Sequence, residues 1–202
     1  MTDAQLLAAP VVLPFMLAAL ALLLRRRLIA TQAIGVAGPL CLMVVSLALL
    51  DRTNGGTRIP ATVFGGWQQG FGIGFSATLP GVALVAVTAL VALAAAIYSL
   101  CDIGPRRRRA GYDALMLALL GAVNGAFLTD DLFNLYVWFE LALVAALGLI
   151  TIDRRPAQID GAIRYASFAM LAATAILLGV GMIYGITGAL DIATVAKVLA
   201  AR

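Results

Sequence analysis

Residues 112–152 decide how this chain folds, and they read YDALMLALLGAVNGAFLTDDLFNLYVWFELALVAALGLITI. A helix needs about 20 apolar residues to cross the hydrocarbon core of a bilayer, so a run of about 40 makes two crossings. The only polar break in the run is Thr129-Asp130-Asp131. The stretch therefore predicts two consecutive membrane-spanning helices joined by a turn at these residues.

The rest of the chain repeats this pattern. Its 202 residues are 63% apolar and 12% charged, with a mean hydropathy of +1.03, whereas soluble proteins average roughly half apolar and a quarter charged. Four further apolar runs lie at 6–24, 28–50, 77–100 and 162–190. We therefore expect an all-α integral membrane protein of about six helices, with kinks at Pro14 and Pro39. Residues 1–110 would hold three helices with an outer, hairpin-like loop at 51–75, and residues 111–202 three more helices.

The positive charges indicate the orientation. Ten of the 14 Lys and Arg residues lie in or beside the connections that follow spans 1, 3 and 5, and the other four are Arg52, Arg58, Lys197 and Arg202. Because cytoplasmic loops are enriched in Lys and Arg, the N-terminus and the 51–75 connection are expected outside. No basic face carries the interleaved aromatic residues that stack on bases, so nucleic acid is excluded as a partner.

Metal, cofactor and enzyme chemistry find no support in the sequence. The chain has no histidine, and its two cysteines, Cys41 and Cys101, are predicted at different membrane depths. Neither a metal-ligand spacing nor a disulfide is therefore expected. The glycine-rich run at 70–74 leads into a membrane span rather than a strand–loop–helix unit, which argues against a phosphate-binding loop. No nucleophile–base pair is present, so we expect neither a cofactor nor catalysis.

Glu140 is the principal candidate site residue. It is the only glutamate in the chain, and it lies about 12 Å of helix rise beyond Leu132, near the middle of the fifth span. A carboxyl group at that depth costs several kcal/mol unless it is protonated, paired or hydrated, and such residues commonly mark proton or ion routes. The alternative is a protonated, purely structural hydrogen-bonder. We favour a role in ion movement.

Three further residues are supporting candidates. Tyr136 lies one turn before Glu140 on the same helix face. It either takes part in the site with Glu140 or packs against neighbouring helices. Asn124, in the fourth span, either joins the site or, as we favour, hydrogen-bonds across helices. Asp131, with Asp130, fits a solvated turn better than an ion ligand.

Small residues at regular spacing predict close helix packing. Two pairs are spaced four residues apart, Gly121 with Gly125 and Gly181 with Gly185. A small-residue stripe recurs every seven residues at Ser167, Thr174, Gly181 and Gly188.

Residues 122–140, which read AVNGAFLTDDLFNLYVWFE, closely resemble the fourth and fifth helices of a known family. It is the D subunit of Mrp-type multisubunit cation/proton antiporters, homologous to the antiporter-like, proton-pumping subunits of respiratory complex I. FGGW at 64–67 and FGI at 71–73 resemble the family's outer hairpin, and GVGMIYGITG at 179–188 resembles its sixth helix. The resemblance covers essentially the whole chain.

The resemblance implies a role for Glu140. In that family the fifth-helix glutamate is essential, pairs with a lysine on the seventh helix and helps to gate proton movement along a polar axis. Two features depart from the pattern. Many relatives have an aspartate entering the third helix, whereas residues 75–79 read FSATL. Relatives also continue into two inverted five-helix repeats, so this chain is expected to match their N-terminal part. Lys197, the only lysine, lies beyond the sixth span and cannot be the buried partner.

We therefore expect a proton-translocating, antiporter-like subunit of the inner or plasma membrane. It would work with other membrane subunits to exchange Na⁺ or another monovalent cation for H⁺, or to couple proton flow to redox chemistry. The main alternative is a structural subunit of such a complex that moves nothing. A self-contained small-solute transporter is disfavoured, because the chain shows no internal repeat that could provide alternating access.

Overall fold

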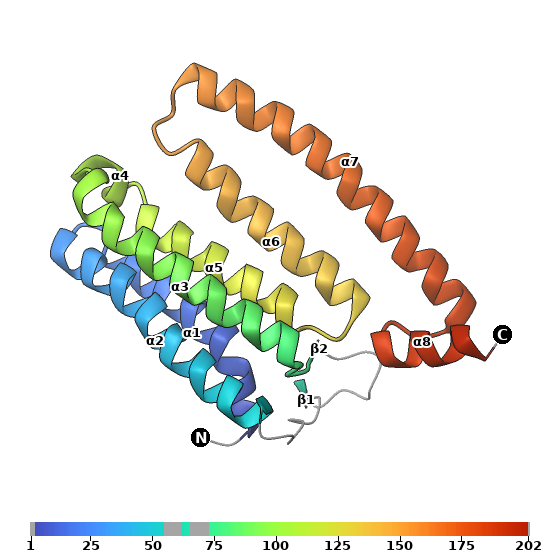
Figure 1. Ribbon diagram of the computed structural model, residues 1–202. Helices are drawn as coiled ribbons and strands as arrows, with labels where there is room; N and C mark the ends of the chain where they lie inside the picture. Colours follow the sequence, from blue (N-terminus) through green and yellow to red (C-terminus); the bar gives the residue numbers. More distant parts are fainter. Residues whose placement is uncertain (1–2, 55–61, 65–72, 202) are drawn as a thin grey trace.

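The computed structural model describes residues 3–54, 62–64 and 73–201 of the chain. Within these ranges the elements follow one another as Figure 1 shows. They are α1 (Asp3–Leu23), α2 (Leu28–Asn54), β1 (Thr62–Phe64), β2 (Ile73–Phe75), α3 (Leu79–Asp102), α4 (Pro105–Arg109), α5 (Tyr112–Leu128), α6 (Leu132–Ile150), α7 (Pro156–Thr187) and α8 (Ile192–Ala200).

Six of these helices correspond to the six predicted spans. Among the described residues, α1, α2, α3, α6 and α7 are long and apolar enough to cross a membrane. Helix α5 has 17 residues, which is the lower end of the spanning range of about 17–25. The expected all-α membrane fold is confirmed.

The helices form a bundle with an outlying pair. Helices α1, α2, α3 and α5 pack together, α6 packs on α5, and α7 packs on α6 (Figure 1). The bundle core is fully buried at Leu7, Leu42, Val82 and Leu128. Helix α7 instead exposes large apolar side chains such as Phe168, which is 74% exposed. An exposed apolar helix of this length is stable in lipid or against another apolar surface, not in water.

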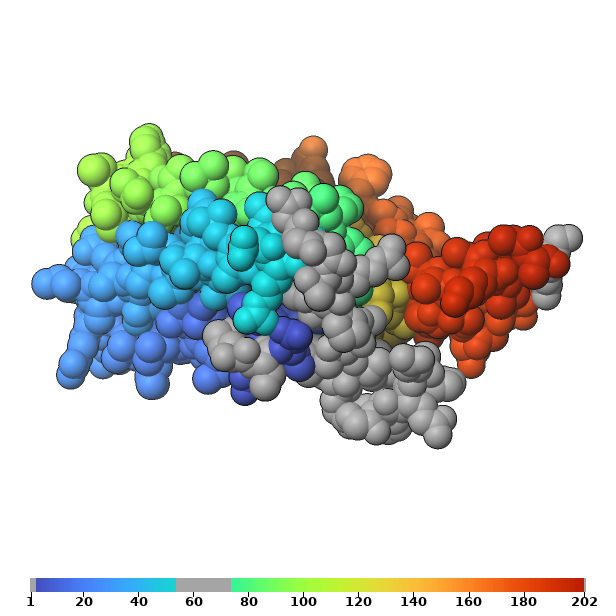
Figure 2. All heavy atoms as spheres, turned by 60° about the horizontal axis from the view of Figure 1, so that its bottom comes forward, coloured from blue at the N-terminus to red at the C-terminus, as the bar shows by residue number. Residues whose placement is uncertain are grey.

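Three details of the predicted boundaries were wrong. The sixth helix ends at Thr187 rather than at 190, because Gly188 adopts a left-handed conformation with φ of 69° that closes the helix. Helix α8 was not predicted. It is capped by Asp191, whose side chain accepts a hydrogen bond from the Thr194 amide at 2.8 Å, and it projects at one end of the molecule (red in Figure 2). The arginine run expected in a loop forms helix α4, started by Pro105.

The outer connections are tied together by backbone hydrogen bonds. Strands β1 and β2 pair antiparallel with Thr62 opposite Phe75, which confirms the predicted short hairpin. The rest of the predicted outer loop, residues 55–61 and 65–72, lies outside the described residues. The Ser76 amide donates to the Leu128 carbonyl at 2.8 Å, and the Leu132 amide to the Leu190 carbonyl at 3.0 Å. The hairpin, the α5–α6 turn and the α7–α8 link therefore form one hydrogen-bonded layer.

Asp130 and Asp131 are not solvated turn residues, contrary to expectation. Asp131 is only 5% exposed, and its carboxylate accepts a hydrogen bond from the Asn134 amide at 2.7 Å, which caps α6. Asp130 is half-buried, and burial raises the pKa of its carboxyl, with Asp131 and Asp191 adding to the increase. Both differ from expectation because β2 and the α7–α8 link cover the turn.

Candidate functional site

Glu140 lies in a groove between α6 and α7. The groove has a volume of about 530 Å³ and is lined mainly by apolar and aromatic side chains, among them Phe139 on α6 and Tyr165 and Phe168 on α7. Glu140 is half-buried, and its side chain makes no hydrogen bond or ion pair with any residue that the structure describes. Tyr136 lines the same groove, as its four-residue spacing predicts. The structure therefore places a carboxyl group in an apolar groove, without a side-chain partner among the described residues.

Asn124 faces a different helix. It is completely buried, and its side-chain amide donates a hydrogen bond of 3.0 Å to the carbonyl of Pro10 on α1. In a regular helix that carbonyl would accept from the amide of residue 14, but Pro14 has no amide hydrogen. Asn124 therefore supplies the missing donor, which confirms the predicted hydrogen bond across helices. Of the four candidate residues, the structure brings together only Glu140 and Tyr136, because Asp131 caps α6 at the outer end.

One glycine pair packs as predicted and the other does not. A Cβ atom added to Gly121 would lie 2.9 Å from the Phe15 ring, and one added to Gly125 would overlap the Trp138 ring. Gly125 thus lets α6 approach α5 closely. A Cβ added to Gly181 or Gly185 meets nothing within 4 Å. The small-residue stripe, which lies on α7, does not pack within the part of the chain described here, because α7 contacts α6 through other residues.

A buried ion pair was not predicted from the sequence. Arg108 is 2% exposed, and its Nη1 lies 2.5 Å from Asp113 Oδ1. Its Nη2 also donates to the Ser99 carbonyl at 2.6 Å, so one guanidinium joins the end of α3 to the start of α5. From the sequence, Arg108 counts only as a loop cation. The one feature of the sequence that could have indicated a buried ion pair is Asp113, an acid at the start of an apolar run, which needs a cationic partner if it is buried.

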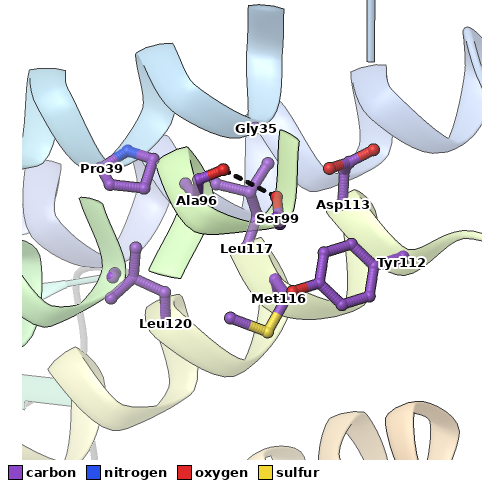
Figure 3. A pocket seen from close by; sticks show the side chains of 10 residues that line it. Gly35, Pro39, Ala96, Ser99, Tyr112, Asp113, Met116, Leu117 and Leu120 are labelled. Carbon is purple, nitrogen blue, oxygen red and sulfur yellow. Dashed lines mark hydrogen bonds between the residues drawn. The ribbon is translucent and has the colours of Figure 1, made fainter. Parts of the chain in front are cut away.

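A small cavity lies beside this ion pair, between α2, α3 and α5 (Figure 3). Its volume of about 20 Å³ is sufficient for one water molecule. Asp113 lines it together with Gly35, Ser99 and Tyr112, and Asp113 Oδ2 is buried with no hydrogen-bond partner among the described residues. These contacts belong to the bundle interior and not to the groove that holds Glu140.

The long apolar helices, with arginine-rich connections at one end of them, define a multi-pass membrane protein, and the single acid in the α6–α7 groove is typical of an ion-translocating subunit. Comparison with known proteins identifies its relatives. The chain is homologous to the D subunits of Na⁺/H⁺ antiporters. It is 33% identical over 91% of its length to the D subunit of the Na⁺/H⁺ antiporter of Bacillus subtilis. It is 34% identical over 98% of its length to the D subunit of the probable K⁺/H⁺ antiporter of Rhizobium meliloti.

Two further comparisons agree. Residues 103–201 match the family described as NADH dehydrogenase I, subunit N related protein. The fold superposes on a chain of the Mrp complex from Dietzia sp. DQ12-45-1b with a TM-score of 0.86 and 26% identity, covering 99% of this chain and 40% of that one. A chain of the archaeal membrane-bound sulfane sulfur reductase gives the same TM-score at 24% identity, over 96% of this chain and 40% of that one, which shows the shared fold.

The chain spans about 37% of the length of either of the two antiporter subunits. It corresponds to the N-terminal part of the antiporter-like fold.

Proposed function

We propose that this chain is the proton-handling part of an antiporter subunit that exchanges a monovalent cation for H⁺, and that Glu140 carries the proton. One observation carries the proposal: Glu140 is a half-buried acid in the apolar groove between α6 and α7, and its side chain has no partner in the part of the chain that the structure describes. An ionised carboxylate is costly in such a groove unless a cation or water compensates it. A carboxyl group in this position suits the transfer of a proton between the groove and a transported cation or water.

Tyr136 supports this role. Its side chain lies in the same groove, and its ring packs at 6.1 Å from that of Phe133, which restricts its motion. A phenol one turn from a carboxyl group can hydrogen-bond either to that group or to a water that hydrates it. We assign Tyr136 a positioning role, and Asn124 and Asp131 structural ones.

We propose a monovalent cation as the transported ion without choosing between Na⁺ and K⁺. Two relatives of similar identity are named for different cations, Na⁺ and K⁺, so similarity does not select between them. The partners proposed are other membrane subunits of a multisubunit complex, as the Mrp relative suggests. We propose a transport role without catalysis in the chain itself. We also propose that residues 1–110 form peripheral helices and that residues 111–202 form the start of the first antiporter repeat.

The test is cation/proton exchange by the full-length protein in its complex, measured in everted membrane vesicles by the dequenching of a pH-sensitive dye on cation addition. Glu140→Gln keeps the size and hydrogen-bonding capacity of the side chain but removes its exchangeable proton, so exchange should be abolished. Glu140→Asp should retain partial exchange, because the carboxyl remains but retreats by one methylene. Tyr136→Phe should slow exchange without abolishing it.

The matched control is Asp160→Asn. Asp160 is an exposed acid on α7, paired with Arg164 at 2.8 Å, and its removal should leave exchange unchanged. Assembly of each variant is checked by copurification of the other subunits. If vesicles with Glu140→Gln assemble normally and exchange cations at the wild-type rate, the structural-subunit alternative replaces the proposal.

A further inference from the structure

A basic cleft lies between α4 and the link that joins α6 to α7. Both segments lie at the same end of the molecule (Figure 1). Its volume is about 730 Å³. Four arginines line it, Arg106 and Arg107 from α4 and Arg154 and Arg155 from the link, together with the acids Asp102 and Asp153. Two segments far apart in the sequence thus converge to form a cleft with an excess of positive charge.

Much of the negative charge in the cleft is already neutralised. Arg107 binds Asp153 with two parallel hydrogen bonds, Nε to Oδ1 at 2.7 Å and Nη2 to Oδ2 at 2.6 Å. Gln158 also donates to Oδ2, at 3.4 Å. This contact raises the pKa of Arg107 and lowers that of Asp153, so both stay charged at neutral pH. The pair fixes the two walls of the cleft relative to each other.

The remaining guanidinium groups are available to an anion. Arg106 and Arg154 are exposed, and neither forms an ion pair with a residue in the described ranges. Arg155 only approaches Asp153, at 4.0 Å. Arg107 uses Nε and Nη2 for its carboxylate contacts, and its Nη1 has no hydrogen-bond partner among the described residues. Several guanidinium forks that converge from two walls suit the tetrahedral oxygens of a phosphate group.

The surroundings of the cleft select a lipid phosphate over a soluble one. The cleft lies where α3 ends and α7 begins, at the end that the charge distribution assigns to the cytoplasm. Within a few residues of the cleft along the chain, the ends of α3, α6 and α7 expose apolar side chains, including Leu100 at 43%, Ile150 at 39% and Ile159 at 44%. A cation-rich cleft at helix ends that expose apolar side chains suits the charged and the apolar ends of a phospholipid.

We propose that this cleft binds the phosphate headgroup of an anionic phospholipid of the cytoplasmic leaflet. Arg106 and Arg154 bind the phosphate from opposite walls, and the Arg107–Asp153 pair holds those walls in place. A bound lipid would reinforce the connection between the bundle and the α6–α7 pair, which carries Glu140. The proposal does not depend on Glu140 being the proton carrier.

The experiment measures binding of phosphatidylglycerol to the full-length protein in its complex, purified in detergent, by native mass spectrometry during a lipid titration. The test variant is the double substitution Arg106→Gln with Arg154→Gln, which leaves the Arg107–Asp153 pair intact. The matched control is Arg25→Gln with Arg26→Gln. These two exposed arginines lie in the α1–α2 connection on the same side, and their removal lowers the net charge equally.

Each interfacial arginine contributes about fivefold to the binding of an anionic lipid, so the test variant should bind phosphatidylglycerol about 30-fold more weakly than wild type. The control should differ from wild type by less than about fivefold, and phosphatidylcholine should not occupy the site. An equal loss in the test variant and the control would overturn the proposal, because general surface charge would then explain the binding. Displacement of the lipid by millimolar inorganic phosphate would overturn the lipid assignment and identify a site for soluble anions.

Discussion

The hydrogen bond between Asn124 and the Pro10 carbonyl yields a quantitative prediction. Asn124→Leu removes the donor while nearly keeping the side-chain volume, and it leaves the Pro10 carbonyl without a partner, because Pro14 cannot supply one. Pro14→Ala restores the amide hydrogen that a regular helix directs at that carbonyl. The destabilisation caused by Asn124→Leu should therefore be smaller in the Pro14→Ala background than in the wild type.

The expected coupling free energy follows from the burial of this contact. Hydrogen bonds between membrane helices contribute about 0.6 kcal/mol on average and about 1.7 kcal/mol at most. Asn124 is completely buried, and its acceptor has lost its helical donor, so this bond belongs in the upper half of that range. We expect a coupling of about 1 kcal/mol, equivalent to about a fivefold change in the unfolding equilibrium constant.

The measurement is a double-mutant cycle by reversible unfolding in mixed detergent, with the fluorescence of Trp138 as the signal, since its ring packs against Phe15 of α1 at 6.3 Å. Pro10→Ala is the matched control. It removes a proline from the same helix without adding a donor for the Pro10 carbonyl, so Asn124→Leu should cost the same there as in wild type. If Asn124→Leu costs the same in all three backgrounds, within about 0.3–0.5 kcal/mol, the compensation argument is wrong.

Three further predictions follow from particular contacts. Gly125→Ala should destabilise the protein by about 1–3 kcal/mol through overpacking against Trp138. Gly181→Ala, with open space around it, should change the stability by less than about 0.5 kcal/mol in the same unfolding assay. Because burial raises the pKa of folded Asp130 above its unfolded value of about 3.9, ionisation costs stability as pH rises through the raised value. Asp130→Asn should therefore unfold later than wild type at pH 7 and together with it below about pH 3.5, and equal stability at both pH values would contradict this. A topology reporter inserted after Arg109 should be cytoplasmic and one after Asn54 external, and detection of both on one side would refute the span count.

The buried ion pair shows where sequence reasoning stops. Arg108 is one of four consecutive arginines, and nothing in the run distinguishes it from its neighbours. Helix α4 turns Arg108 inward to Asp113 and the Ser99 carbonyl, while Arg107 extends to Asp153 on the α6–α7 link. Which arginine is buried depends on the helical phase of a five-residue segment and on what packs against each of its faces. Neither quantity is encoded in the local composition.

The sequence by itself determined the membrane-spanning architecture and the position of Glu140 near the middle of its helix. Both depend on the length and polarity of continuous segments, and the bilayer imposes these requirements on each helix separately. Only the tertiary structure decided which helices pair. It directed Asn124 to the Pro10 carbonyl, buried Asp131 under β2 and the α7–α8 link, and placed Glu140 with Tyr136 in the α6–α7 groove. These outcomes depend on contacts between residues as much as 114 positions apart, and the physical reason is that such contacts form only when helix packing brings distant groups within hydrogen-bonding distance.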